Sequence, residues 1–206
     1  MAKVIEPSYT ILTPIDGEEV LRHIESCGRT CYMSFEKTGE GTHRKFAGHI
    51  VERHHESVLE HFSISVRFVV DRGVTHELVR HRIASYSQES TRYCNYGKGK
   101  FGSEITVIRP CELKEGTPEY KIWLDAVNEA EKHYMQLTEA GVKAEIARSV
   151  LPTGVKSEIV TTANLREWRH IFIMRTGKAA HPDIRYVMQP LKEEFKKRIP
   201  IIFDDL

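Results

Sequence analysis

The sequence predicts an α+β fold in which helices are segregated from a small mixed or antiparallel sheet. Residues 62–70 alternate apolar and polar side chains, which is the pattern of a half-buried strand. Residues 118–140 instead repeat apolar side chains at helical spacing. We see no internal repeat or linker-like composition, and therefore expect one domain over residues 1–206.

Residues 16–82 are predicted to form three helices and a strand. Asp16 is placed to cap a helix over 18–26, because its carboxylate can accept from the first free amides, and Gly28 is expected to end it. A mobile loop at 36–42 separates this helix from a second one. The later elements expected here are a helix over 43–54, the strand over 62–70 and a helix over 74–82 that Asp71 caps.

The rest of the chain alternates between helices and short strands. Residues 83–103 are polar with weak periodicity, and Pro110 ends a strand at 105–108. The helix at 118–140 carries Ile122, Ala126, Ala130, Tyr134 and Leu137 at helical spacing. The remaining expected elements are a Gly141 cap, a helix over 142–151, a β-branched strand over 155–163, a helix over 165–175 that Asn164 can cap and Gly177 ends, and a helix over 182–198 with a kink at Pro190.

Composition and charge exclude several classes of protein. The 206 residues carry 30 basic and 29 acidic side chains, so a nucleic-acid-like basic surplus is absent. The excess is local, because residues 1–140 have net charge −3 and residues 141–206 have +4. The four cysteines form no CxxC pair, and no signal peptide or membrane-length apolar run occurs. We therefore expect a cytoplasmic protein with reduced thiols and no membrane partner.

The densest polar stretch runs from Arg80 to Tyr93 and contains three arginines, one histidine and several hydroxyls. Guanidinium groups and hydroxyls together are suited to phosphate oxygens. A solvated arginine face remains the simpler alternative. A nucleic-acid-binding module is another, in which Tyr86, Tyr93 and Tyr96 would stack on bases. No P-loop or G-x-G-x-x-G motif is present, so a nucleotide would bind by other means.

Histidines and cysteines raise the question of zinc. The cluster from His54 to His61 lacks the HExxH spacing of a metalloprotease, although a zinc hydrolase stays a rival hypothesis. His23, Cys27 and Cys31 are spaced to share a helix face, but the helix is expected to end near Gly28. We predict no metal site.

Four ordered motifs resemble the flavin-dependent thymidylate synthases, the ThyX family. They are Arg80-His81-Arg82 followed after seven residues by Ser90, His55-Glu56-x3-Glu60-His61, Ala147-Arg148-x2-Leu151-Pro152, and Asn164-x-Arg166-x8-Arg175. The resemblance covers residues 20 to 190 and implies a ThyX-type fold. It also implies synthesis of dTMP from dUMP, with methylenetetrahydrofolate as one-carbon donor and FAD, reduced by NADPH, as hydride source. The implied assembly is a homotetramer whose sites are shared between chains.

The resemblance also assigns roles to individual residues. Arg175 is the implied catalytic residue, which stabilises negative charge on the uracil ring. The implied FAD ligands are His55, Ser57, Glu60, Arg80, His81, Arg82, Ile83, Gln88, Asn164, Arg166 and His170. The implied dUMP ligands are Glu77, Arg80, Gln88, Glu89, Ser90, Thr91, Arg92, Arg148 and Arg175.

Three positions depart from the family pattern. Glu77 stands where glutamine is common, Ser87-Gln88-Glu89 replaces a common Asn-Glu version, and His170 stands where asparagine is frequent. Individual contacts to flavin and dUMP are therefore expected to differ from the family's. The nucleic-acid module, the zinc hydrolase and a purely structural oligomer remain the alternatives.

Overall fold

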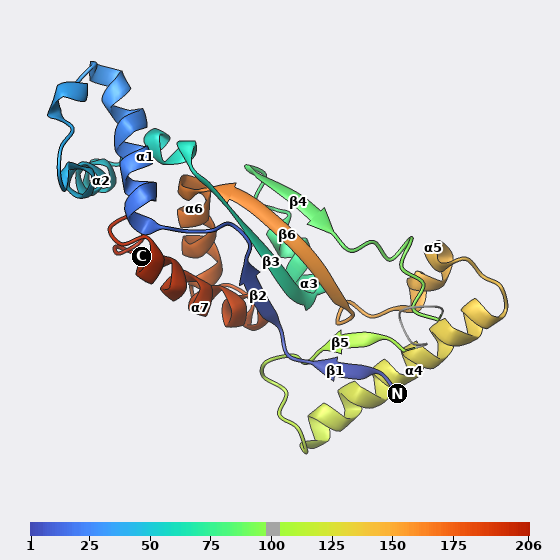
Figure 1. Ribbon diagram of the computed structural model, residues 1–206. Helices are drawn as coiled ribbons and strands as arrows, with labels where there is room; N and C mark the ends of the chain where they lie inside the picture. The colour runs from blue at the N-terminus through green and yellow to red at the C-terminus, as the bar shows by residue number, and fades with distance from the viewer. Residues whose placement is uncertain (98–103) are drawn as a thin grey trace. The chain divides into compact units, whose positions relative to one another are not determined.

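The computed structural model describes residues 1–97 and 104–206 (Figure 1). Residues 98–103, the end of the polar stretch predicted at 83–103, lie outside the described residues. The chain divides into two compact units, which we describe separately. The first unit is Met1–Ser8, Phe68–Arg80 and Tyr86–Val160, and the second is Tyr9–Arg67, His81–Ser85 and Thr161–Leu206.

The expected helices and strands form with shifted ends, except that the helix expected at 142–151 is mostly absent. The α-helices are α1 (Gly17–Arg29), α2 (Thr42–Glu52), α3 (Arg72–Leu78), α4 (Pro118–Glu139), α5 (Ala144–Ala147), α6 (Leu165–Thr176) and α7 (Pro182–Arg198). The 3₁₀ turns are η1 (Thr30–Tyr32), η2 (Phe35–Lys37), η3 (Glu56–His61) and η5 (Arg148–Val150). The strands are β1 (Lys3–Ile5), β2 (Ser8–Ile11), β3 (Ser63–Asp71), β4 (Ala84–Gln88), β5 (Thr106–Ile108) and β6 (Lys156–Asn164).

The strands form two small sheets, one of which is a parallel pair. In that pair β1 runs beside β5, and Val4 lies opposite Val107. The other sheet has the order β2-β3-β6-β4. Its central strands are antiparallel, since the Arg72 amide donates to the Val155 carbonyl and the Leu165 amide donates to the Phe62 carbonyl. The predicted α+β fold with a small mixed or antiparallel sheet is confirmed.

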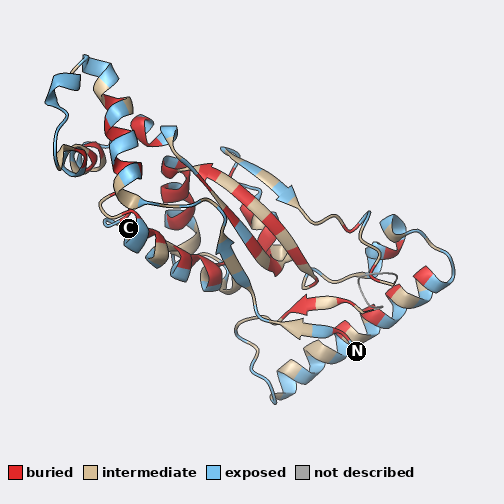
Figure 2. Ribbon diagram, in the orientation of Figure 1, coloured by how far each residue is buried: buried red, intermediate tan, exposed pale blue. Residues whose placement is uncertain are grey.

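Alternation along β3 and β6 explains why they form the centre of this sheet. Ile64, Val66, Phe68 and Val70 of β3 are all fully buried, as the spacing predicts. Figure 2 shows the same alternation along β6, whose buried positions include Ile159. A strand with every second side chain buried fixes its register, because a one-residue slip would expose the whole apolar set.

The second unit has an aromatic core beneath α6. Trp168 and Phe172 on α6 pack against Phe195 of α7, with ring centroids 5.3 and 5.2 Å from that of Phe195. Phe203 near the chain end joins them, 5.3 Å from the Phe195 ring. The Trp168 indole also donates to the Ile64 carbonyl over 3.0 Å. This core fixes the orientation of α6, which carries most of the polar groups discussed below.

The first unit has a smaller core between β5 and α4, and here one prediction is wrong. The buried face of α4 contains Val127 and Tyr134, while Ile122 is 71% exposed and Ala126 is exposed as well. Ile122 and Ala126 lie on the helix face next to the buried one. The correct stripe includes Glu131, whose carboxylate accepts from the Ile105 amide over 3.0 Å.

Three local predictions need correction. Helix α1 continues through Gly28 to Arg29, since the missing side chain there makes room for the Phe46 ring rather than ending the helix. The helix expected at 142–151 is only the short α5 followed by η5, and Lys143 before α5 provides no side-chain cap. Part of the loop expected at 36–42 forms η2. The strands β1, β2 and β4 and the turn η3 were not predicted, since they are short.

Candidate functional site

One contact of the second unit joins a buried histidine to an arginine of α6. The Nε–H of Arg175 donates to Nε2 of His81 over 3.0 Å. The His81 side chain is only 5% exposed. Burial, followed by the positive charges of Arg175 and His170, lowers the pKa of His81 to about 4. His81 is therefore a neutral imidazole at neutral pH, and its Nε2 lone pair is the acceptor.

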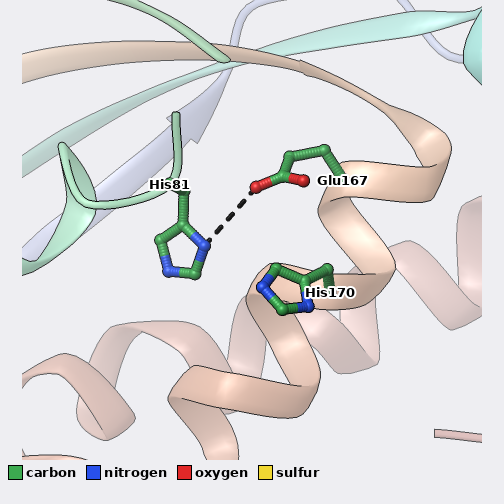
Figure 3. Close-up of side chains that lie close together, drawn as sticks. All are labelled: His81, Glu167 and His170. Atoms are coloured by element: carbon green, nitrogen blue, oxygen red, sulfur yellow. Dashed lines mark ion pairs between the residues drawn. The ribbon is translucent and has the colours of Figure 1, made fainter. Parts of the chain in front are cut away.

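Two further side chains of α6 face the same imidazole (Figure 3). Nδ1 of His81 lies 3.5 Å from Oε1 of Glu167, and the His170 ring approaches edge-on with centroids 5.6 Å apart. The Asn164 side chain caps α6 by accepting from the Glu167 amide over 2.8 Å, which places Glu167 in the first turn. Residues three apart share a helix face, so Glu167 and His170 point the same way. Burial raises the pKa of Glu167 against the opposing charges of His170 and Arg166.

This cluster has the composition of a metal site but an unfavourable charge. One ligand atom each from His81, Glu167 and His170 lie within 4.8 Å of one another. A cation placed there would meet the guanidinium of Arg175, which already donates to His81. Among the described residues, no other three histidine, cysteine or acidic side chains come together in this way. Within the described residues, three ligands therefore come together neither in the His54–His61 cluster nor in the set of His23, Cys27 and Cys31.

A cavity of about 410 Å³ lies beside this cluster in the second unit. It is lined by Glu56, Glu60, Ile83, Asn164, Arg166, Glu167, Arg169, His170 and Ile173. Five of the eleven predicted FAD ligands are in that lining, namely Glu60, Ile83, Asn164, Arg166 and His170. Arg166 is held by ion pairs of 2.6 Å to Glu60 and 3.6 Å to Glu56.

The other predicted FAD ligands lie elsewhere. His55, Ser57 and Arg82 are exposed residues of the second unit outside that lining, and His81 is buried and does not line the cavity. Arg80 and Gln88 belong to the first unit. The Gln88 amide donates to the hydroxyls of Thr75 (2.9 Å) and Ser157 (3.1 Å), which fixes the end of β4.

Glu89 is occupied by contacts within the first unit. Its carboxylate accepts from the Tyr96 hydroxyl over 3.0 Å, from Lys156 Nζ over 2.8 Å and from the Glu158 amide over 3.3 Å. Burial and the Glu89 charge raise the pKa of Tyr96. These bonds anchor the segment that leads into Ser90, Thr91 and Arg92, so Glu89 acts here as a structural anchor.

A second cavity, of about 590 Å³, lies in the first unit and contains two predicted dUMP ligands. Its lining residues are Arg72, His76, Thr91, Glu145, Ile146, Arg148, Ser149, Leu151, Pro152 and Thr153. Nη1 of Arg148 donates to the Thr91 hydroxyl over 3.1 Å. Nη1 of Arg72 is buried and has no hydrogen-bond acceptor within the described part of the chain. An unsatisfied guanidinium nitrogen beside a second arginine favours an anionic ligand.

The remaining predicted dUMP ligands are not in that lining. Ser90 accepts from the Arg92 amide over 3.3 Å, and the Arg92 guanidinium is half exposed, 3.9 Å from Glu145. Glu77 is half-buried on α3, and Arg80 is exposed just beyond that helix. Arg175, in the second unit, is half-buried at the end of α6.

Sequence reasoning missed Glu167, Arg72 and His76. Glu167 had a readable signal, because it lies three residues after the helix cap Asn164 and three before His170. Arg72 and His76 lie one turn apart on α3, but they join no motif that singles them out. Their place beside Arg148 comes from tertiary structure.

An α+β fold with polar, arginine-bearing cavities and a histidine of strongly lowered pKa has the features of a ligand-binding enzyme. The chain belongs to the family of flavin-dependent thymidylate synthases. The family model described as "Thymidylate synthase complementing protein" matches residues 15–201.

Curated relatives and a solved structure agree with this membership. The chain is 40% identical over 167 residues to a flavin-dependent thymidylate synthase of Pyrococcus abyssi, covering 80% of this chain and 67% of that one. It is 38% identical over 200 residues to the Pyrococcus furiosus enzyme of the same name, covering 96% and 80%. The crystal structure of the UMP/dUMP methylase PolB from Streptomyces cacaoi, bound with 5-Br dUMP, has the same fold, with a TM-score of 0.79 and 22% identity over 98% of this chain and 95% of that one.

The helices of the described residues lack the features of membrane spans. None of them combines the length and apolar character that crossing a bilayer requires.

Proposed function

We propose that this chain is a flavin-dependent thymidylate synthase that converts dUMP to dTMP. Methylenetetrahydrofolate would provide the one-carbon unit, and FAD reduced by NADPH would provide the hydride. Family membership supports the reaction class. The observation that carries the proposal within this chain is the Arg175 guanidinium, held at the end of α6 by a neutral, buried histidine.

The second-unit cavity is suited to part of a flavin. Ile83 and Ile173 line it with side chains that are 70% and 58% exposed, and such apolar surfaces favour a flat ring system. Asn164, Arg166 and His170 add hydrogen-bonding groups to the same cavity. FAD bound there would supply the reducing hydride, and the protein would orient it and exclude water. His55, Ser57, Arg80, His81, Arg82 and Gln88 stay proposed ligands from the family pattern.

The first-unit cavity is suited to the nucleotide phosphate. Arg148 and Thr91 are already hydrogen-bonded to each other there, and the Arg72 guanidinium presents a buried unsatisfied nitrogen. Arginine forks bind phosphate oxygens with two parallel bonds, which fixes both position and orientation. Ser90 and the half-exposed Arg92 follow the segment that Glu89 anchors, and we keep them as proposed dUMP ligands.

The proposed role of Arg175 follows from the chemistry of uracil. C5 of uracil is a weak nucleophile, and stabilising negative charge on the ring raises electron density at C5. A guanidinium in a partly desolvated site stabilises such charge more strongly than it could in water. Arginine stays protonated in proteins, so Arg175 would stabilise charge without acting as the base.

Further parts of the proposal come from the family resemblance. The active assembly would be a homotetramer with sites shared between chains, located in the cytoplasm. The nucleic-acid alternative fits less well, because Tyr86 donates its hydroxyl to the Leu78 carbonyl over 2.6 Å and Tyr96 is buried against Tyr134. Of the three tyrosines that base stacking would use, Tyr93 is the exposed one, at 81%.

The visible absorption spectrum of the purified protein tests the proposal, followed by assay of dTMP. We expect oxidised-flavin bands that co-purify or bind stoichiometrically, and that shift when dUMP is added. With methylenetetrahydrofolate and NADPH, dTMP should then accumulate. Failure to bind FAD in excess, or flavin binding with no dTMP from the complete mixture, would contradict the proposed function.

A further inference from the structure

We propose that His170 is a proton acceptor linked to the redox state of the second-unit cavity: its imidazole takes up a proton from water when a bound flavin is reduced, and releases it when the flavin is reoxidised. The inference rests on the proposed function, because it assigns a task toward the flavin that this cavity is proposed to hold. An asparagine, which is frequent at this position in the family, cannot perform the task, since its amide does not titrate.

His170 is placed to meet a ligand of the cavity. It is an exposed residue of α6, and it lines the cavity together with Ile83 and Ile173, the apolar side chains that favour a flat ring. Its ring lies edge-on to the buried ring of His81, with centroids 5.6 Å apart (Figure 3). Within the described part of the chain, the His170 imidazole makes no hydrogen bond or ion pair. A ring nitrogen is therefore available to accept a proton.

The two arginines that line the same cavity already have anionic partners. Arg166 binds Glu60 at 2.6 Å, and Arg169 binds Asp205 through two hydrogen bonds of 2.7 Å. Either guanidinium could compensate a new negative charge in the cavity only by weakening its existing ion pair. His170 is the remaining basic side chain of the lining, and it can compensate such a charge by gaining a proton.

Reduction of the flavin would create a negative charge of this kind. A hydride from NADPH carries two electrons and one proton: a C–H bond of the nicotinamide breaks, an N–H bond of the flavin forms, and the reduced ring gains one negative charge. The second proton comes from water and is held by His170, which becomes a cation. When the hydride passes on to the one-carbon unit, the negative charge is lost and the imidazole returns its proton to water.

Charged and titratable groups surround the imidazole on three segments of the second unit. They are Glu56 and Glu60 on η3, Arg166, Glu167, Arg169 and Arg175 on α6, and His81. The positive charge of His170 opposes the rise in the Glu167 pKa that burial causes, so each of these two side chains favours the charged form of the other. His81 does not take the proton near neutral pH, because burial and the charges of Arg175 and His170 lower its pKa to about 4.

The pH dependence of the flavin midpoint potential counts the protons taken up on reduction. The FAD-loaded protein, without dUMP or folate, is reduced stepwise against reference dyes at intervals between about pH 6 and 8. For two electrons, each proton contributes about 30 mV per tenfold change in proton concentration. We expect a wild-type slope that corresponds to between one and two protons, whereas His170→Asn should give one proton throughout.

Three further variants identify the group that holds the second proton. His49→Gln, at an exposed position of α2, is the control and should keep the wild-type slope. Glu167→Gln should retain the second proton but take it up at lower pH, because the imidazolium loses a neighbouring carboxylate. His170→Lys remains charged throughout the interval, so it should take up one proton and give a higher potential than His170→Asn at every pH. Visible absorbance confirms equal flavin content.

The outcomes separate this inference from the proposed function. If the protein binds FAD but makes no dTMP, the proposed function fails, and the proton count still decides the role of His170. A wild-type slope of one proton throughout would overturn the inference, as would equal slopes for His170→Asn and wild type. Loss of the second proton in Glu167→Gln, with its retention in His170→Asn, would assign it to the carboxyl instead. Failure to bind FAD would overturn both the inference and the proposed function.

Discussion

The guanidinium of Arg169 binds the carboxylate of Asp205 through two parallel hydrogen bonds, Nη1 to Oδ1 and Nη2 to Oδ2, each 2.7 Å long. Arg169 is 5% exposed on α6, and Asp205 is the residue before the last. Nη1 also donates to the Ile202 carbonyl, and Nε donates to Glu56 over 3.4 Å. One buried arginine thus holds the end of the chain against the helix that carries Arg175.

Loss of the Asp205 carboxylate should destabilise the protein. We expect Asp205→Ala to lower the free energy of unfolding by about 2 kcal/mol, because the buried guanidinium of Arg169 loses a charged partner. The half exposure of Asp205 limits the size of this loss. Urea denaturation measures the change. The control is Glu129→Ala, which removes an exposed pair with Lys132 and should cost under about 0.5 kcal/mol. Equal stability of Asp205→Ala and the control would contradict the role given to this pair.

The close packing of Gly28 against Phe46 predicts that a substitution at Gly28 lowers stability. A Cβ at this position would lie 2.3 Å from Cζ of Phe46 and 2.7 Å from Cε1, which is too close. Gly28→Ala is therefore expected to lower stability by about 1 to 3 kcal/mol through overpacking, although alanine is the better helix former. Adding Phe46→Leu should restore part of the loss.

Gly48 provides the matched control for that substitution. It lies inside α2, where an added Cβ would have its nearest neighbour at 4.0 Å. Gly48→Ala should raise stability by about 0.5 to 1 kcal/mol through helix propensity alone. A stabilising Gly28→Ala would show that the Phe46 contact imposes no constraint.

Elements of the fold were predicted correctly where their sequence signal is local, and wrongly where the outcome depends on tertiary packing. Strand β3 was predicted almost to its ends, because burial of every second side chain is written directly into its apolar alternation. Asp16, Asp71 and Asn164 were correct caps, since capping depends on residues only two or three positions away. Ile122 was assigned to the wrong face of α4. Apolar residues occur on two neighbouring faces of this helix, and only tertiary packing determines which face is buried.

The candidate sites were less predictable, because they depend on contacts between distant segments. The polar stretch and the later arginines were found as motifs, but the bond between His81 and Arg175 joins residues 94 positions apart. Arg72 lines the first-unit cavity only because of the fold, since no motif includes it. Glu89 could be identified as a polar residue, whereas its three structural bonds required the positions of Tyr96, Lys156 and Glu158.

Replacing Arg175 should separate catalysis from folding. We expect Arg175→Ala to fold and to bind flavin nearly as wild type does, and to lose dTMP formation by at least about 10²-fold, the scale of losing one preorganised charge-stabilising group. Circular dichroism, flavin absorbance and product assay give the three readouts. Lys178→Ala, which removes an exposed cation three residues later, is the control and should keep wild-type turnover. Turnover by Arg175→Ala equal to the control would refute the catalytic role of Arg175.

Glu89 should affect stability more than nucleotide affinity. Its carboxylate is 11% exposed and lies beside Lys156. Burial alone would lower the pKa of Lys156, but hydrogen bonds and charges of Glu89 and Glu158 raise it overall. Glu89→Gln is expected to cost about 1 to 3 kcal/mol of unfolding free energy, since a partly buried cation loses its partner. The Kd for dUMP should change less than about threefold. An unaltered stability with a large rise in Kd would instead make Glu89 a direct ligand.

The lowered pKa of His81 predicts a pH dependence of stability with a definite sign. In the unfolded chain the group titrates near its ordinary value of 6.5, and in the folded protein near about 4. Between these values the unfolded state binds a proton that the folded state does not, so the unfolding free energy falls as the pH is lowered from about 6.5 to about 4. One such proton contributes a slope of at most about 1.4 kcal/mol per pH unit.

His81→Gln removes that proton from the balance, so its stability should decline less steeply than that of wild type over the same interval. The raised pKa of Glu167 has the opposite sign, because a carboxyl that binds its proton more readily when folded gains stability as the pH falls. Both proteins retain Glu167, and the difference between their slopes therefore isolates the imidazole. His133→Gln, at an exposed site on α4, is the control and should keep the wild-type slope. Urea denaturation at intervals between pH 4 and 7 measures all three, and matching slopes for His81→Gln and wild type would mean that His81 is not held neutral by the fold.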